Sequence, residues 1–420
     1  MSCKDCSTAN VKVEQGHINK FIWNGKPAKI KHTTLIADKA GWGLNAPDLA
    51  TMQKSLRLAW LVRLINNDTH MLVDSLLDKY GGIKLLLNSD YDPKLLELPE
   101  FYRNIFLHFS ELGGNTNKKT ILWNNKNIKI NNKLLYLREW KQNGLLYVSQ
   151  LIENNVTISA ERLKIKFGLR SINVMVYNAI TLQINKLLKD ETSKKNIFEN
   201  DNINFDTNNF KLQNEFLNIS LAKCKDYYQL LINPKCEPAS SHRYWEKSQI
   251  TKSLEYQNSM TLACRSCSES IFLSFHFKMM HNILPSGENL KKWGIRLSDV
   301  CPLCGDCEST AHILFKCPDT KKTLKSIMDI IKFQPLNNEI KDLNNFLFGT
   351  QNHQLNYLLL FIKNYIYEMR KNEQIFHESH FKKEIALRIF SDENSLSCHK
   401  FNMKWGDLKH LQDNSYDNIL

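Results

Sequence analysis

The sequence lacks the features that a secreted or membrane-spanning chain needs. Residues 1–10 contain no apolar segment behind a basic one, as a secretion signal would. The apolar run from Tyr357 to Ile362 ends at Lys363 and is far shorter than the roughly 20 residues of a membrane-spanning helix. We therefore expect a soluble, intracellular protein, nuclear or cytoplasmic, with no membrane partner.

Internal repeats are also missing, which argues against solenoid and propeller folds. The 420 residues are 42% hydrophobic and 24% charged, the ordinary range for globular proteins. Most of the chain should therefore fold, in roughly two or three domains. Lysine and arginine number 56 against 43 aspartate and glutamate, a net charge of +13, and this excess favours a polyanionic partner such as RNA or DNA.

Apolar periodicity predicts a mainly α fold. Apolar residues recur at three- and four-residue steps over 49–63, behind Asp48, which is typical of a helix start. Over 72–112, apolar clusters alternate with glycine and proline turns, which favours short helices. The clean stripe over 355–369 predicts a longer helix, with Lys363 off its apolar face.

Changes in composition divide the chain. Residues 190–215 are polar and rich in asparagine, which predicts a flexible linker, and a second change occurs near Pro234. The expected segments are 1–70, 71–189, a linker with a flanking helix at 190–234, and a helical C-terminal domain at 235–420.

The stretch from Lys118 to Lys141 holds seven basic residues and one acid, interleaved with Trp123, Tyr136 and Trp140. Lysines such as Lys126 and Lys129 could bind phosphates while tryptophan rings stack on bases. The alternative is a solvated basic face over two core tryptophans. The sequence leaves both open.

A zinc motif stands out in the C-terminal domain. Cys301, Cys304, His312 and Cys317 give the spacing C-x2-C-x7-H-x4-C, a complete set of the ligands that tetrahedral zinc takes. With no position left for water or substrate, the ion would be structural. The alternative is a chance gathering of buried cysteines, and Cys307 competes within the motif, but His312 has the spacing to Cys317 that zinc knuckles use.

Two further C-x2-C pairs lack matching downstream ligands. Cys264/Cys267 and Cys3/Cys6 are therefore not assigned to metal. His276 and His281 lie near the first pair in an amphipathic run, where a buried, hydrogen-bonded histidine is commoner than a ligand.

The zinc motif and its surroundings resemble a known family. Phe277 to Pro285, Trp293-Gly294-Ile295 and the knuckle 301–317 are similar to the zinc-binding domain that follows the polymerase in LINE-type (non-LTR) retrotransposon reverse transcriptases. Phe21 to Lys26 and Gly41 to Leu49 resemble the segment just beyond the polymerase palm of the same proteins. The family usually has two adjacent glycines where Trp42 separates Gly41 from Gly43 here.

The resemblance implies a thumb-like segment at 1–70, a helical connector at 71–189, and a C-terminal domain that helps to hold template RNA and target DNA. It does not imply catalysis, because the sequence has no Asp-Asp pair, and two-metal nucleotidyl transfer needs paired carboxylates. The family's nuclease would lie upstream of residue 1, and residues 318–420 offer no acidic pair with a following lysine in a strand context. We therefore expect no enzyme activity.

The leading hypothesis is a protein that binds RNA or single-stranded DNA, takes one structural zinc ion and has no small-molecule substrate. The expected nucleic-acid contacts are Lys291, Lys292, Arg296, Lys316, Lys321, Lys322 and Lys325 around the knuckle, with Lys126, Lys129 and Trp123. The alternative for the residues around the knuckle is an ordinary lysine-rich surface whose positive field is weakened by nearby acids. A second hypothesis is a protein-interaction fragment whose partner could be the rest of the reverse transcriptase, and a nuclease in the last hundred residues ranks third.

Overall fold

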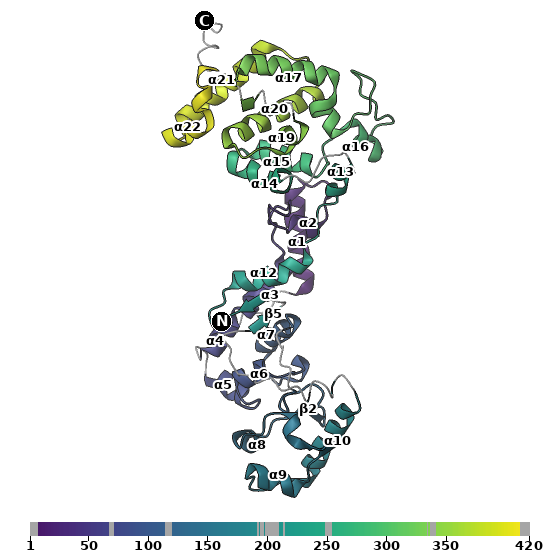
Figure 1. Cartoon of the computed structure of the whole chain (residues 1–420), viewed down its shortest axis with the longest axis vertical. Helices are drawn as coiled ribbons and strands as arrows, with labels where there is room; N and C mark the ends of the chain where they lie inside the picture. Colours follow the sequence, from purple (N-terminus) through teal and green to yellow (C-terminus); the bar gives the residue numbers. More distant parts are fainter. Residues whose placement is uncertain are drawn as a thin grey trace. The chain divides into compact units, whose positions relative to one another are not determined.

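The computed structural model describes residues 7–66, 71–113, 120–190, 193, 197, 210–212, 215–247, 254–333, 335–336 and 342–411. The chain forms two compact units (Figure 1). Unit 1 contains residues 1–25 and 47–235, and unit 2 contains residues 26–46 and 236–420. Both are built almost entirely from helices, so the prediction of a mainly α fold is confirmed.

Unit 1 follows the short-helix pattern of its sequence. The helix predicted from Leu49 is observed, with the Asp48 side chain accepting from the N–H of Thr51 at 3.1 Å, but it divides at Ala59. The helices are α1 (Thr8–Ile22), α3 (Leu49–Leu58), α4 (Trp60–Ile65), α5 (Met71–Asp78), α6 (Ile83–Leu87), η1 (Pro93–Leu95), α7 (Glu100–Glu111), α8 (Arg138–Gln142), η2 (Val148–Leu151), α9 (Ala160–Phe167), α10 (Val174–Leu188), α12 (Cys224–Ile232) and η3 (Asn233–Lys235).

The described part of unit 1 also contains three small antiparallel strand pairs: β1 (Lys129–Ile130) with β2 (Lys133–Leu134), β3 (Ile152–Glu153) with β4 (Val156–Thr157), and β5 (Phe210–Leu212) with β6 (Glu215–Leu217). Asn131 and Asn132 join the first pair with φ of 50° and 59°, since asparagine tolerates the left-handed region that a tight hairpin needs. Most of the predicted linker at 190–215 lies outside the described residues.

Two apolar cores hold unit 1 together. The first gathers residues of α4 to α7 around Phe106, and α12 returns late in the chain to pack against α3 and supply Tyr227 and Leu230. The second surrounds Trp123 and Trp140 with residues of α9 and α10. The first core therefore joins residues that lie far apart in the sequence.

Unit 2 is built around one buried helix. Its helices are α2 (His32–Leu35), α13 (Ser241–Lys247), α14 (Leu254–Ser266), α15 (Ser270–Met280), α16 (Gly287–Lys292), the π-helix η4 (His312–Lys316), α17 (Pro318–Ile331), α19 (Leu343–Phe348), α20 (His353–Lys371), α21 (Glu378–Ser395), α22 (Cys398–Trp405) and η5 (Gly406–Leu408). Helix α20 packs against α14, α15 and α22 (Figure 1). It also packs against η4. Every residue from Leu355 to Tyr367 is buried, so the predicted helix exists but has no solvent face there.

Lys363 corrects the expectation that it lies off the apolar face of this helix. Its side chain is buried, and Nζ donates to the carbonyl of Leu347, near the end of α19, at 2.7 Å. Burial lowers the pKa of Lys363 to about 7. The periodicity predicted the helix but could not show that a second layer covers its polar face.

Residues 26–46 belong to unit 2, although the sequence placed them with the amino-terminal segment. Trp42 is 0% exposed, its ring stacks on His242 at 3.9 Å, and its carbonyl accepts from Nε2 of His281 at 2.7 Å. Gly43 follows where a Cβ would lie 1.9 Å from the carbonyl oxygen of Ala37. Trp42, which separates Gly41 from Gly43, is therefore part of the core of unit 2.

No helix among the described residues is both long enough and apolar enough to cross a membrane.

Candidate metal centre

A tight hairpin presents the first two zinc ligands. Val300 pairs with Cys307 in an antiparallel bridge, and the N–H of Cys301 donates to the carbonyl of Asp306 at 2.7 Å. Gly305 closes the turn with φ of 84°, a conformation that a side chain would strain. The turn places Cys301 and Cys304 on the same side.

The other two ligands come from the segment that leads into α17. His312 begins the π-helix η4, whose wider turn is common at functional sites, and Cys317 follows it directly. Cys317 is also the N-cap of α17, with Pro318 at the first helical position. A thiolate at a helix N-terminus is favoured by the helix dipole.

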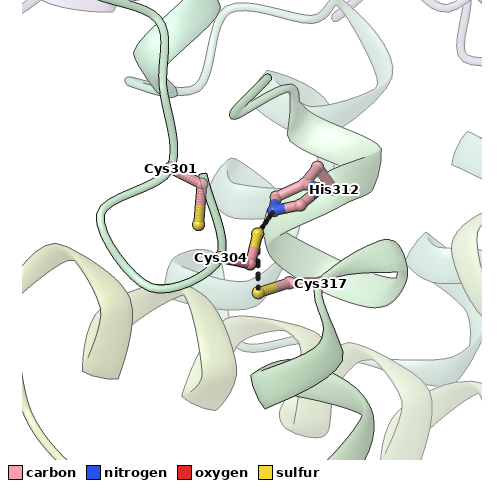
Figure 2. A group of neighbouring side chains, drawn as sticks. All are labelled: Cys301, Cys304, His312 and Cys317. Carbon is pink, nitrogen blue, oxygen red and sulfur yellow. Dashed lines mark hydrogen bonds between the residues drawn. The ribbon is translucent and has the colours of Figure 1, made fainter. Parts of the chain in front are cut away.

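The four side chains point toward one another (Figure 2), and their ligand atoms all lie within 4.8 Å of one another. Nε2 of His312 lies 3.3 Å from Sγ of Cys304, and Sγ of Cys317 lies 4.0 Å from the same sulfur. Tetrahedral zinc with its usual bond lengths separates sulfur from nitrogen by about 3.6 Å and sulfur from sulfur by about 3.8 Å. The cluster therefore fits one zinc ion held by four protein ligands.

The charge of the cluster also calls for a cation. Burial raises the pKa of the Cys301 thiol, but hydrogen bonds involving the Leu303 backbone and His312 outweigh it and lower the pKa to about 6. A backbone hydrogen bond at Asp306 lowers the pKa of Cys304, whereas burial and the sulfurs of Cys301 and Cys317 raise it to about 12. The neighbouring sulfurs thus oppose the ionisation of more than one thiol, and a divalent cation would favour the thiolate form of all of them.

Arg370, at the end of α20, supports the centre from outside. Its Nη2 donates to Sγ of Cys301 at 2.8 Å, and Nε and Nη2 donate to Oε1 of Glu308 at 3.1 and 3.0 Å. Oε2 of Glu308 accepts from Arg296 at 2.7 Å, and the glutamate side chain is only 7% exposed. The sequence had no local signal for Arg370, because it reaches the centre only when α20 packs against the knuckle.

The other cysteines that the structure describes do not join the cluster. Cys307, the competing ligand in the motif, is exposed on the hairpin. Cys267 is buried, its sulfur accepts from the N–H of Glu269 at 3.3 Å, and burial raises its pKa to about 11. Cys3 and Cys6 lie outside the described residues. His276 and His281, also set aside as ligands, are buried and hydrogen-bonded to Ser259 and Trp42.

One comparison with known proteins bears on the site. The model of a family described as zinc-binding in reverse transcriptase matches residues 223–323, which run from α12 into α17 and contain all four zinc ligands. No curated protein matches the chain. The matched segment is therefore a reverse-transcriptase-related zinc-binding region.

The basic residues predicted around the knuckle divide into two groups. Lys291 pairs with Asp299 at 3.0 Å, and Arg296 is held by Glu308 and the carbonyl of Val300. The others are exposed and make no ion pair with any acid that the structure describes. These five are Lys292, Lys316, Lys321, Lys322 and Lys325, and the last three lie on α17.

The basic-aromatic stretch in unit 1 does not present its tryptophan for binding nucleic acid as predicted. Trp123 is 0% exposed and its indole N–H donates to the carbonyl of Leu145 at 2.7 Å, so its ring is not available for stacking on a base. Lys126 pairs with Asp90 at 3.1 Å and Lys129 with Asp92 at 3.4 Å. The structure corrects the role drawn for Trp123, because the ring is buried in an apolar core, and favours the alternative of a basic face over core tryptophans.

Proposed function

We propose that this chain is the nucleic-acid-binding C-terminal portion of a LINE-type (non-LTR) retrotransposon reverse transcriptase, without polymerase or endonuclease chemistry of its own. The observation that carries the proposal is the zinc centre of unit 2, which lies inside the segment that matches the reverse-transcriptase zinc-binding family. A reverse transcriptase handles an RNA template and a DNA product, so a domain carried with it has nucleic acid at hand.

The chemistry of the centre supports a structural rather than a catalytic ion. Cys301, Cys304, His312 and Cys317 would take all four coordination positions, so neither water nor substrate would have a place on the metal. The ion would join the hairpin to the start of α17, and Arg370 links the same hairpin to α20. The zinc would thereby hold a rigid surface in place.

The charges around the centre support a polyanionic partner. Lys292, Lys316, Lys321, Lys322 and Lys325 are exposed and make no ion pair among the described residues, in a chain with a net charge of +13. Nucleic-acid phosphates would serve as the anionic partners of these lysines. The release of counterions on binding would make the affinity salt-dependent. The lack of an Asp-Asp pair in the sequence supports the absence of polymerase chemistry.

The test combines zinc analysis with RNA binding over a salt series, for the natural protein and for Cys301→Ser/Cys304→Ser. We expect one zinc per chain and binding that weakens steeply with salt. If each of the five lysines neutralises one phosphate, log K should fall against log salt with a slope of about −3.5 for a single strand. The double variant should lose zinc and most of the binding.

Three outcomes are informative. Zinc without any RNA or single-stranded DNA binding would contradict the nucleic-acid role and leave a structural remnant. Binding that does not change with salt would contradict its electrostatic basis. A chain that takes up no zinc would overturn the site itself.

A second candidate function is protein interaction, and one observation favours it. Three aliphatic side chains on and beside the knuckle are strongly exposed: Ile295 at 70%, Leu297 at 99% and Leu303 at 56%. Exposed apolar groups gathered in one segment can mark a protein contact. A partner that stays bound in high salt, with no binding of nucleic acid, would select this function.

A further inference from the structure

A lysine and a tryptophan from distant parts of the sequence meet in unit 2. Nζ of Lys29, in the segment that leads into α2, lies 3.2 Å from the centroid of the Trp293 ring. Trp293 follows α16 directly and is half-buried. The contact is a cation–π interaction, which holds the residue 26–46 segment against the helix beside the zinc hairpin.

The charges of two further lysines, Lys26 and Lys278, act on Lys29. Partial burial lowers the pKa of Lys29, and the charges of Lys26 and Lys278 lower it further. Lys26 precedes it in the same segment, and Lys278 projects from α15. All three side chains are exposed. The charge of Lys29 is therefore disfavoured by the charges of the other two lysines.

These lysines have no acidic partner among the residues that the structure describes. Their neighbour Lys31, only two positions after Lys29, pairs with Glu237 at 2.8 Å. Lys382 is paired with Glu378 in the same way. The repulsion within the cluster is thus left unneutralised by the described part of the fold, and an anion would relieve it.

The aromatic ring narrows the choice of anion. Groups that bind single-stranded nucleic acid combine cations for the phosphates with a ring on which a base can stack. Lys29 covers one face of the Trp293 ring. A strand could draw the Lys29 ammonium to a phosphate and place a base on the ring. A base pair within a duplex could not reach the ring in this way without unstacking.

We propose that Lys26, Lys29, Lys278 and Trp293 form a binding site for single-stranded nucleic acid, with the lysines on the phosphates and the indole ring under a base. This site rests on the proposed function, and it adds a ring for a base to the phosphate contacts proposed for the knuckle lysines. Segment 26–46 would then contribute both to the core of unit 2, through Trp42, and to its ligand.

The experiment measures binding of a labelled oligouridylate to the full chain in a salt series. Lys29→Ala/Lys278→Ala should weaken binding about tenfold or more at low salt and make the slope shallower by about 1.4, since about 0.7 is lost per phosphate contact on a single strand. Lys382→Ala/Lys409→Ala is the charge-matched control in the same unit. Its two lysines each pair with an acid, at 2.7 and 2.9 Å, and its slope should stay that of the natural protein.

The ring is tested separately. Trp293→Ala should weaken binding of the oligouridylate about tenfold and leave binding of a duplex of equal length nearly unchanged, because only the single strand offers a base. Trp293→Phe keeps an aromatic face and should recover most of the loss. Zinc content and the melting temperature show whether each variant folds. If Lys29→Ala disturbs the fold, Lys278→Ala alone carries the test.

The outcomes separate this site from the proposed function. If the natural protein binds the oligouridylate and the Lys29/Lys278 variant has the same slope and affinity as the control, the site is wrong while nucleic-acid binding stands. If the natural protein binds no nucleic acid at all, both are wrong. Equal losses for duplex and single strand in Trp293→Ala would overturn the role of the ring.

Discussion

Replacing Arg370 by methionine tests whether packing outside the four ligands tunes the zinc centre. Methionine keeps much of the unbranched aliphatic stem but removes the donor to Sγ of Cys301 at 2.8 Å and both donors to Glu308. The sulfur loses a hydrogen bond that favours its thiolate form. Among the described residues, Glu308 then keeps only Arg296 as a cationic partner, although its side chain is 7% exposed.

The size of the effect follows from these contacts. Loss of a supporting hydrogen bond around a metal ligand typically lowers metal affinity by about 10- to 100-fold, or about 1.4 to 2.7 kcal/mol. Leaving a buried carboxylate without one of its partners should cost a further 1 to 3 kcal/mol or so in the stability of unit 2. We therefore expect weaker zinc binding and a lower free energy of unfolding together.

Zinc affinity is measured by competition with a chromophoric chelator, and stability by urea unfolding with zinc in excess. Arg388→Met is the control, since Arg388 pairs with Glu269 and Glu384 and contacts none of the zinc ligands. It should lower stability and leave zinc affinity unchanged. Unchanged zinc affinity in a folded Arg370→Met protein would refute the reasoning, because the hydrogen bond to Cys301 would then contribute nothing to the site.

Two further predictions concern the core of unit 2. Burial lowers the pKa of Lys363 from 10.5 to about 7, so between these pH values the folded state binds fewer protons than the unfolded state and stability rises with pH. Relative to Lys363→Met, the natural protein should gain up to about 5 kcal/mol across this interval in urea unfolding, and a difference that does not change with pH would contradict the burial. Gly43→Ala would place a Cβ 1.9 Å from the carbonyl of Ala37 and should cost about 2 to 3 kcal/mol, whereas Gly406→Ala, with nothing within 4 Å, should be close to neutral in thermal unfolding.

Local features of this protein could be predicted from its sequence. The spacing of Cys301, Cys304, His312 and Cys317 predicted a zinc site because a short loop and one helical turn determine where those four side chains go. Apolar periodicity likewise predicted α20, and Asp48 predicted the start of α3 in unit 1. Each signal is complete within about twenty residues, so no knowledge of the rest of the chain is needed.

What depends on distant contacts was decided only by the tertiary structure. Lys363 looked like a surface residue from its neighbours in sequence, and those of Trp123 left open whether its ring was exposed or in the core, but other layers of the fold cover both. Arg370 reaches Cys301, and Lys29 reaches Trp293, across long stretches of chain. A residue's environment is set by every element packed around it, and sequence periodicity describes only the element to which the residue belongs.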